Sequence, residues 1–240
     1  MNLSDVFNDP PRPHEGMVMG LVEAAVNFIY ENVDDQCRTL ETGCGLSTVA
    51  FALRESRHTV IAPALSEFEI IKKYCRDRGI QTSQIEFIAE PSQKVLPGLE
   101  PTPLDLVLID GGHGFPTPYV DWFYTAGRLK KGGFLVVDDV WLWSCRILRD
   151  FLVEQPQWKF VEEYGERTTI FQKLDDGSEW LEWTEQPLSA RGGKMKWIDG
   201  KCVFDEPAAD DNLAALKRVV NDLKRGDFKV VAQKIGRRLR

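Results

Sequence analysis

The residues with the clearest chemical potential surround a short turn in the run CRTLETGCGLSTVAFAL, which spans residues 37–53. Gly43 and Gly45 carry no Cβ, so the backbone N–H groups of the turn can approach a bound molecule closely. The helix expected to begin after the turn adds unpaired N–H donors and a partial positive charge. Glu41 adds a carboxylate at the end of the preceding strand. Together these features predict a site for a nucleoside-containing cofactor.

The turn does not have the sequence of a dinucleotide-binding fingerprint. That fingerprint, G-x-G-x-x-G, would place a third glycine at the position of Thr48. It also has an acidic residue about 20 positions after the first glycine to bind the ribose, whereas this chain reads Ala62-Pro63-Ala64-Leu65 there. A dinucleotide cofactor and hydride transfer are therefore disfavoured.

Further polar side chains end or follow the later apolar segments. Asp110 and His113 belong with the run LDLVLID, and Asp138 and Asp139 with the run FLVVD. Near-continuous aliphatic runs of this kind are typical of buried parallel strands. Ligands of open parallel sheets bind beyond the carboxyl ends of the strands, so we expect these four side chains to lie near the glycine turn.

Alternating strand and helix patterns are expected to position both groups. Apolar residues at helical spacing predict a helix over residues 16–33, and the proline-containing residues 1–15 are expected to be irregular. Strands are predicted at residues 39–41, 58–62, 85–89, 104–110 and 134–138, with an antiparallel pair at 159–164 and 168–173. Helices are predicted at residues 46–54, 66–78, 119–129 and 145–154, the third of them stopped by Gly132-Gly133. This order predicts an α/β fold with a Rossmann-like, doubly wound, mostly parallel sheet.

The character of the sequence changes after residue 174. We therefore expect a first domain of residues 1–174, with an N-terminal helix, and an irregular C-terminal extension of residues 175–240. In the extension, Asp199-Gly200 between two strand-like runs predicts a hairpin, and residues 212–240 are expected to be helical.

Composition and charge restrict the kind of protein. The 240 residues carry a net charge of −7, yet residues 217–240 contain nine Lys/Arg and two Asp/Glu. This basic tail would suit nucleic acid or anionic lipid, but packing on the chain's own acidic body is the simpler expectation. No apolar run approaches the ~20 residues that span a bilayer, and no secretory signal is visible. The five scattered cysteines disfavour a disulfide framework and a structural zinc site, so we expect a cytoplasmic protein.

The E-T-G-C-G pattern, together with the order of elements, resembles the class I S-adenosylmethionine-dependent methyltransferases over roughly residues 16–174. The resemblance implies S-adenosylmethionine as cofactor, with Glu41 near its methionine amino group and Gly43 and Gly45 passing under it. The other cofactor contacts that it implies are Cys44 through its backbone, Ser47, Thr48, Asp110, and Ser92 beside the adenine. One position departs from the family: Pro63 stands where an acidic residue usually grips the ribose, so Ser66 or Glu67 would have to reach back.

The segments D-G-G-H at residues 110–113 and D-D-V-W at residues 138–141 resemble the metal-dependent O-methyltransferases of the catechol and caffeoyl-coenzyme A type. They are also similar to bacterial families related to cephalosporin hydroxylase and to sugar O-methyltransferases. The resemblance implies Asp110, Asp138 and Asp139 as ligands of Mg²⁺, the last in place of the usual asparagine. It also implies His113, in place of a lysine, as the group that takes the acceptor's proton.

Simpler interpretations stand beside these. The three carboxylates could cap loops and helices, or orient substrate hydroxyls without a metal. His113 could be a loop histidine bonded to a neighbouring carboxylate, and His58, at the amino end of a strand, is expected to be structural and far from the site. The aromatic residues are equally ambiguous: Trp122, Trp141 and Trp143 suit either an acceptor pocket or the core, and Trp180, Trp183 and Trp197 either a lid or the interface of a homo-oligomer.

The resemblance favours O-methylation of a small hydroxylated acceptor, with His113 and Asp110 as catalytic residues and Mg²⁺ as an optional cofactor. A non-catalytic nucleoside-binding or scaffolding protein on the same fold is the first alternative. A nucleic-acid methyltransferase has only the basic tail in its favour. The acidic body and the absence of an Asn/Asp-Pro-Pro-aromatic motif after the fourth strand count against it.

Overall fold

The computed structural model describes residues 2–13, 20–175, 186–190, 195–198 and 201–204. The chain divides into two compact units, Met1–Glu179 and Trp180–Arg240, which are described separately. Among the described residues, no helix is both long enough and apolar enough to cross a bilayer.

The first unit is built on a seven-stranded sheet with the order β3-β2-β1-β4-β5-β7-β6. Its strands are β1 (Arg38–Thr42), β2 (Arg57–Ile61), β3 (Ile85–Ile88), β4 (Leu104–Ile109), β5 (Leu129–Val137), β6 (Trp158–Tyr164) and β7 (Thr168–Lys173). β1 to β5 run parallel, and β7 is antiparallel to both of its neighbours. The strand order reverses between β1 and β4, where open sheets form a ligand-binding crevice. The predicted doubly wound α/β fold and its closing antiparallel pair are confirmed.

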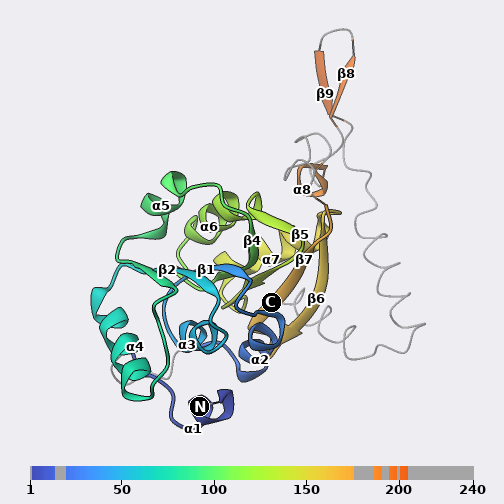
Figure 1. Cartoon of the computed structure of the whole chain (residues 1–240). Helices are drawn as coiled ribbons and strands as arrows, with labels where there is room; N and C mark the ends of the chain where they lie inside the picture. Colours follow the sequence, from blue (N-terminus) through green and yellow to red (C-terminus); the bar gives the residue numbers. More distant parts are fainter. Residues whose placement is uncertain (1, 14–19, 176–185, 191–194, 199–200, 205–240) are drawn as a thin grey trace, which may run out of the picture. The chain divides into compact units, whose positions relative to one another are not determined.

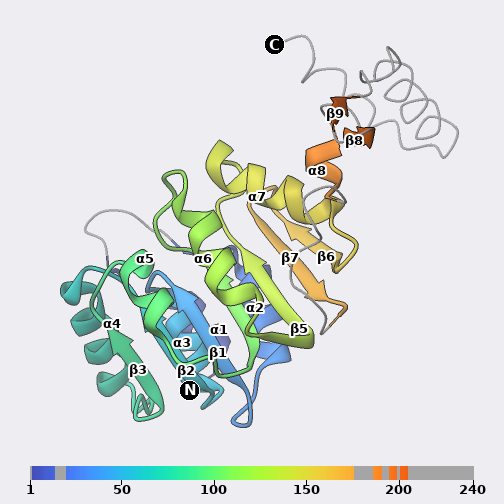
Figure 2. The same ribbon diagram turned by 90° about the horizontal axis from the view of Figure 1, so that it is seen from above.

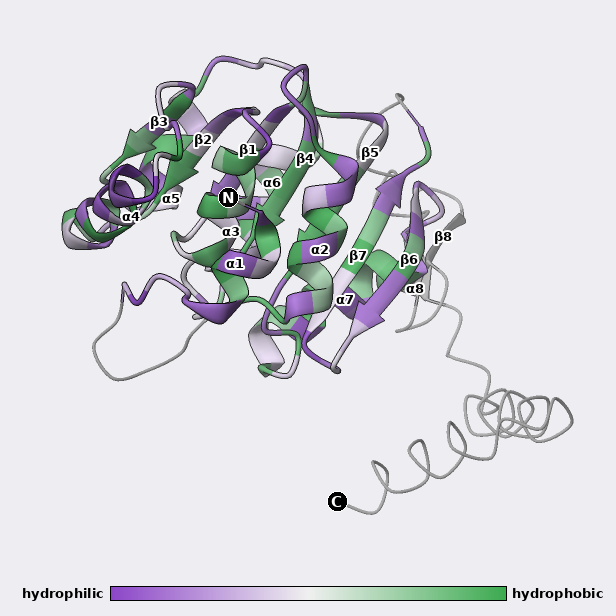
Figure 3. Cartoon of the chain, turned by 60° about the horizontal axis from the view of Figure 1, so that its bottom comes forward, coloured by the Kyte–Doolittle hydropathy of each residue, from purple (hydrophilic) through white to green (hydrophobic). Residues whose placement is uncertain are grey.

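Helices cover both faces of this sheet (Figures 1 and 2). One face carries α1 (Leu3–Asn8), α2 (Glu23–Asn32), α3 (Leu46–Leu53) and α4 (Leu65–Asp77). The other carries α5 (Ser92–Val95), which runs into the 3₁₀ turn Leu96–Gly98, and then α6 (Thr117–Ala126) and α7 (Trp143–Glu154). The central strand β4 therefore needs apolar residues on both sides: Leu106 and Leu108 join the core under α1 to α4, and Val107 and Ile109 alternate to the opposite face. Figure 3 shows the contrast between hydrophobic β4 and the more hydrophilic edge strand β6.

The N-terminal prediction was partly wrong. Residues 1–15 were expected to be irregular, yet Asn2 and Asp5 form a reciprocal capping box that begins α1, and Leu3 and Val6 bury their side chains. The helix predicted over residues 16–33 begins only at Glu23 among the described residues.

The glycine pair was also misinterpreted. Gly132 and Gly133 lie inside β5, and α6 has already ended at Ala126. The strand needs a glycine here because a Cβ on Gly133 would lie 2.9 Å from the carbonyl oxygens of Asp105 and Lys130.

The second unit contains α8 (Pro187–Ala190) and the antiparallel pair β8 (Met195–Ile198) and β9 (Lys201–Phe204). The predicted pairing is therefore confirmed. The helix predicted over residues 212–240 lies outside the described residues.

Candidate functional site

A cavity of about 520 Å³ opens at the carboxyl ends of the central strands. Eight of the predicted site residues line it: Gly43, Cys44, Gly45, Ser47, Ser92, Asp110, His113 and Asp139. Three do not: Glu41, Thr48 and Asp138. Glu67, proposed as a substitute for the missing acid at Pro63, lines the cavity together with that proline.

Gly43 is required by the packing of the strand ends. Its φ is +96°, and a Cβ built on it would lie 2.3 Å from the carbonyl oxygen of Asp110. Its N–H donates to the carbonyl of Ile61, 2.9 Å away, at the end of β2. Glycine therefore lets the turn sit between β2 and β4 and holds it against the loop that carries Asp110.

Gly45 has a different reason to be glycine. Its φ of −177° is extended backbone that any residue adopts, and no neighbouring atom lies within 4 Å of a Cβ built there. Because the residue lines the cavity, its missing side chain leaves free space beside the first turn of α3.

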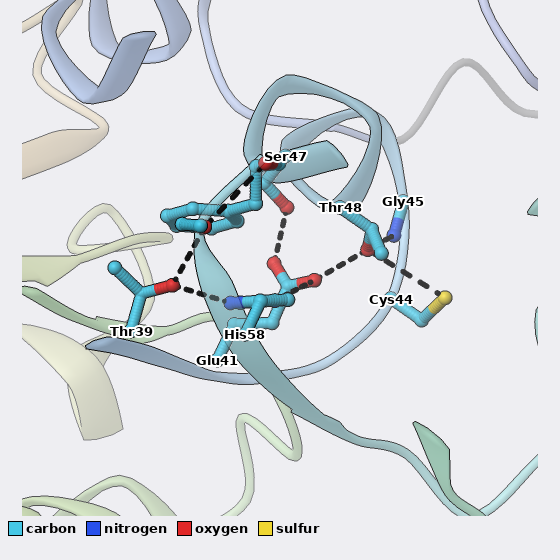
Figure 4. Close-up of polar contacts among 9 residues, drawn as sticks. Thr39, Glu41, Cys44, Gly45, Ser47, Thr48 and His58 are labelled. Atoms are coloured by element: carbon cyan, nitrogen blue, oxygen red, sulfur yellow. Dashed lines mark hydrogen bonds and ion pairs between the residues drawn. The ribbon is translucent and has the colours of Figure 1, made fainter. Parts of the chain in front are cut away.

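Glu41 is turned into the protein behind the glycine turn, with 1% of its surface exposed (Figure 4). Its carboxylate accepts hydrogen bonds from the hydroxyls of Ser47, at 2.6 Å, and Thr48. Thr48 Oγ1 in turn accepts the N–H of Gly45 at 3.1 Å. The expected position near a cofactor's amino group is thus replaced by a position in the protein interior, where Glu41 ties the turn to the start of α3.

His58 is the fourth member of this buried cluster. Its Nε2 lies 3.1 Å from Glu41 Oε1 and its Nδ1 2.8 Å from Thr39 Oγ1. The ring stacks on Phe51 with 4.1 Å between centroids. The parallel register that pairs Thr39 with His58 brings the histidine beside Glu41, where it has the structural role expected of it and does not line the cavity.

Asp110 lies at the centre of the acidic group, directly after β4. Desolvation raises the pKa of its carboxyl well above the usual value, and the negative charges of Asp138, Asp139 and Glu41 act in the same direction. The positive charge of Arg167 opposes this rise.

Asp138 faces away from the cavity. Thr168 Oγ1 donates to its Oδ1, and Arg167 Nη2 donates to its Oδ2 at 3.3 Å. Burial raises the pKa of its carboxyl, and both partners counter that effect. The trio predicted to bind Mg²⁺ is therefore not assembled; among the described residues the groups with metal-ligand spacing are Asp110, His113 and Asp139, whose ligand atoms lie within 4.8 Å of one another.

Asp139 connects the acidic group to the histidine. It adopts a left-handed φ of +53°, which is uncommon outside glycine and frequent at functional sites. Its Oδ1 accepts a hydrogen bond from the indole N–H of Trp141 at 2.7 Å and lies 3.0 Å from Arg167 Nε. Its Oδ2 lies 3.0 Å from His113 Nε2, and His113 Nδ1 lies 4.0 Å from the buried Cys145 Sγ.

Arg167 is the site residue that the sequence did not indicate. It lies in the turn between β6 and β7, far from the glycine turn in sequence, and it carries no local motif. Only the pairing of β5 with β7 brings this turn to the loop that begins with Asp138.

Aromatic side chains flank His113 and Asp139 in the sequence. Phe115, Trp141 and Trp143 expose 72%, 59% and 71% of their surface. Trp122, in contrast, is buried and packs edge-on against Phe151 in the core. Of the three tryptophans considered for an acceptor pocket, Trp141 and Trp143 therefore have surface available for a ligand.

Comparison with known proteins gives this geometry a context. A family model described as a methyltransferase domain matches residues 40–140, and no curated protein matches the sequence. The structure is similar to cofactor-bound Rv0187 from MTB, with 19% identity, a TM-score of 0.55 and coverage of 71% of this chain and 86% of that one. It is also similar to the O-methyltransferase TomG from Streptomyces achromogenes in complex with SAM, with 17% identity, a TM-score of 0.57 and coverage of 72% of this chain and 89% of that one. A third similar structure is that of an rRNA methylase from Streptococcus thermophilus, with 15% identity, a TM-score of 0.51 and coverage of 67% of this chain and 100% of that one.

Proposed function

We propose that this chain, an S-adenosylmethionine-dependent methyltransferase by its domain and its fold, methylates a hydroxyl oxygen of a small acceptor. The observation that carries the proposal is the placement of His113 beside Asp139 in the same cavity as the glycine turn. One end of the cavity then serves the cofactor and the other the acceptor.

The cofactor end offers the groups that a nucleoside sulfonium requires. The turn of Gly43 and Gly45 leaves room for close approach, and Ser92 lies at the N-terminus of α5 on the adenine side. Glu67, in the first turn of α4, also lines the cavity, and we expect it to accept the ribose hydroxyls in place of an acid at Pro63. A Glu67→Gln substitution should weaken binding of S-adenosylhomocysteine about tenfold or more, which titration calorimetry measures.

When bound, S-adenosylmethionine supplies an electrophilic methyl group. Transfer of that methyl group to the acceptor oxygen would form a carbon–oxygen bond as the carbon–sulfur bond breaks, and would leave a methyl ether and S-adenosylhomocysteine. The His113–Asp139 pair takes the proton that the acceptor hydroxyl loses, and Asp139 stabilises the imidazolium that results. Alignment of the acceptor oxygen, the methyl carbon and the sulfur in the cavity would supply most of the remaining rate enhancement.

A divalent ion is a second route to activating the acceptor. Asp110, His113 and Asp139 offer two oxygens and one nitrogen to such an ion, which would lower the pKa of a bound hydroxyl. Turnover measured with chelator and then with added Mg²⁺ separates this route from action of the histidine alone.

Methylation of RNA is the main competing function, because rRNA methylases are among the similar structures. Glu67 adds a carboxylate to the cavity lining, and a carboxylate there repels a phosphate backbone and therefore favours a neutral small acceptor. A cytoplasmic location and a homo-oligomer are retained as parts of the proposal. The free thiols of Cys37, Cys44, Cys75 and Cys145 support a reducing compartment.

The test uses S-adenosylmethionine with a labelled methyl group and a panel of phenols, catechols, sugars and RNA. The proposal expects label in a methyl ether of a small acceptor, and loss of that product in His113→Asn with binding of S-adenosylhomocysteine retained. Label in RNA alone would replace the proposed acceptor class. Binding without any product across the panel would favour the non-catalytic alternative.

A further inference from the structure

Arg167 places a cation against the two consecutive carboxylates that follow β5. Its Nη2 lies 3.3 Å from Asp138 Oδ2 and its Nε 3.0 Å from Asp139 Oδ1. The contact with Asp139 lacks the angle of a hydrogen bond and is therefore mainly electrostatic. The Arg167 side chain is only 28% exposed, so water screens these charges less than at an open surface.

The backbone fixes this cation in place. The carbonyl of Arg167 accepts the N–H of Val140 at 2.8 Å, and the N–H of Arg167 donates to the carbonyl of Tyr164 at 3.0 Å. The next residue, Thr168, donates its hydroxyl to Asp138. Two of these bonds, to Val140 and to Asp138, attach the turn that carries Arg167 to the loop that carries the carboxylates, and the bond to Tyr164 closes the turn itself.

These contacts do not fit the three-carboxylate magnesium site that the sequence predicted. Asp138 is directed to Thr168 and Arg167 instead of the cavity. Both oxygens of Asp139 are already next to cationic or donor groups, with Arg167 and Trp141 on one and His113 on the other. Magnesium requires near-octahedral oxygen ligands, and binding here would place its charge beside a fixed guanidinium.

We infer that Arg167 is a positioning residue that supplies this site with the positive charge a divalent ion would otherwise supply. Its single positive charge offsets part of the negative charge of Asp138 and Asp139 and holds Asp139 toward His113, so methyl transfer proceeds without an added metal. The inference deepens the proposed function and rests on it for the part that concerns turnover. The part that concerns ion binding can be tested without any acceptor.

The experiment compares wild type with Arg167→Met and Arg167→Lys, with Arg149→Met as the matched control. Arg149 is similarly shielded and pairs with Asp150 and Glu163, away from the cavity. Three quantities are measured: kcat and KM in EDTA and in Mg²⁺, binding of Mn²⁺ by electron paramagnetic resonance, and binding of S-adenosylhomocysteine by calorimetry.

Wild type and Arg149→Met should turn over equally in EDTA and in Mg²⁺. Arg167→Met should lose about 10- to 100-fold in kcat with little change in cofactor affinity, and Arg167→Lys should recover part of that loss. Removing the guanidinium should also raise Mn²⁺ affinity above that of wild type, because the two carboxylates lose their counter-ion.

Two results would overturn the inference: wild-type activity that disappears in EDTA and returns with Mg²⁺, or full kcat of Arg167→Met in EDTA. Tight Mn²⁺ binding by wild type, unchanged in Arg167→Lys, would also overturn it, and this measurement remains informative if Arg167→Met does not fold. Absence of product from every variant in both buffers would instead count against the proposed function.

Discussion

His58 Nε2 lies 3.1 Å from Glu41 Oε1 in the interior of the protein, across the paired strands β1 and β2. The contact joins two side chains that are each 1% exposed, behind the turn that lines the cavity. Glu41 also accepts hydrogen bonds from the hydroxyls of Ser47 and Thr48, so one carboxylate contacts two residues of the first turn of α3. The acid of the E-T-G-C-G pattern therefore supports the glycine turn from the protein interior.

Replacing Glu41 should therefore lower the free energy of unfolding. Glu41→Ala leaves His58 and two hydroxyls without their partner, and we expect a loss of about 3–5 kcal/mol in the free energy of unfolding. Urea unfolding measures it, with the exposed Glu69→Ala as a control that should stay within about 0.5 kcal/mol of wild type. Equal stability of both variants would show that the buried cluster contributes nothing.

The two glycines of the turn should respond in opposite ways to the same substitution. Gly43→Ala places a Cβ 2.3 Å from the backbone of Asp110 at a φ of +96°, so it should lose more than about 2 kcal/mol of stability. Gly45→Ala meets no atom within 4 Å and should fold like wild type while binding S-adenosylhomocysteine more weakly. Thermal unfolding measures the stability of the two variants, and calorimetry measures their cofactor affinity. Equal stability of Gly43→Ala and Gly45→Ala would contradict the prediction.

His113 should matter for turnover more than for folding. The side chain is 30% exposed, and its substitution by Asn leaves the glycine turn intact. We expect kcat to fall about 10²- to 10⁴-fold, with the affinity for S-adenosylhomocysteine within about threefold of wild type. Steady-state kinetics with the best acceptor test this, and an unchanged kcat would remove the His113–Asp139 pair from the mechanism.

Asp121 should make stability depend on pH. Burial raises the pKa of its carboxyl above the ordinary 3.8, although the hydroxyls of Ser92 and Thr42 lower it in part. The folded chain thus holds this proton more tightly than the unfolded chain, so stability falls as the pH rises from 3.8 through the folded pKa. Asp121→Asn should be more stable relative to wild type at about pH 7 than at about pH 4. Urea unfolding of both proteins at the two pH values measures this difference in stability. A smaller stability advantage of Asp121→Asn at the higher pH would contradict the prediction.

The sequence predicted the sheet because the near-continuous aliphatic runs at β4 and β5 are typical of parallel strands that are buried on both faces. It misplaced Glu41 because which face a strand-end side chain takes depends on the pleat of the folded sheet, and here Glu41 turns toward Ser47. Arg167 could not be found from sequence because its role arises from the antiparallel pairing of β5 with β7. The start of α1 could have been found, since Asn2 and Asp5 have capping-box spacing.

Titration calorimetry with S-adenosylhomocysteine tests the central claim, cofactor binding at the glycine turn, most directly. Gly98→Val, the control, alters an open position outside the cavity and should bind with the affinity of wild type. Gly45→Val should bind at least about tenfold more weakly, because the added side chain takes up space at the cavity. Failure of folded wild type to bind, or equal binding by all three proteins, would contradict the account.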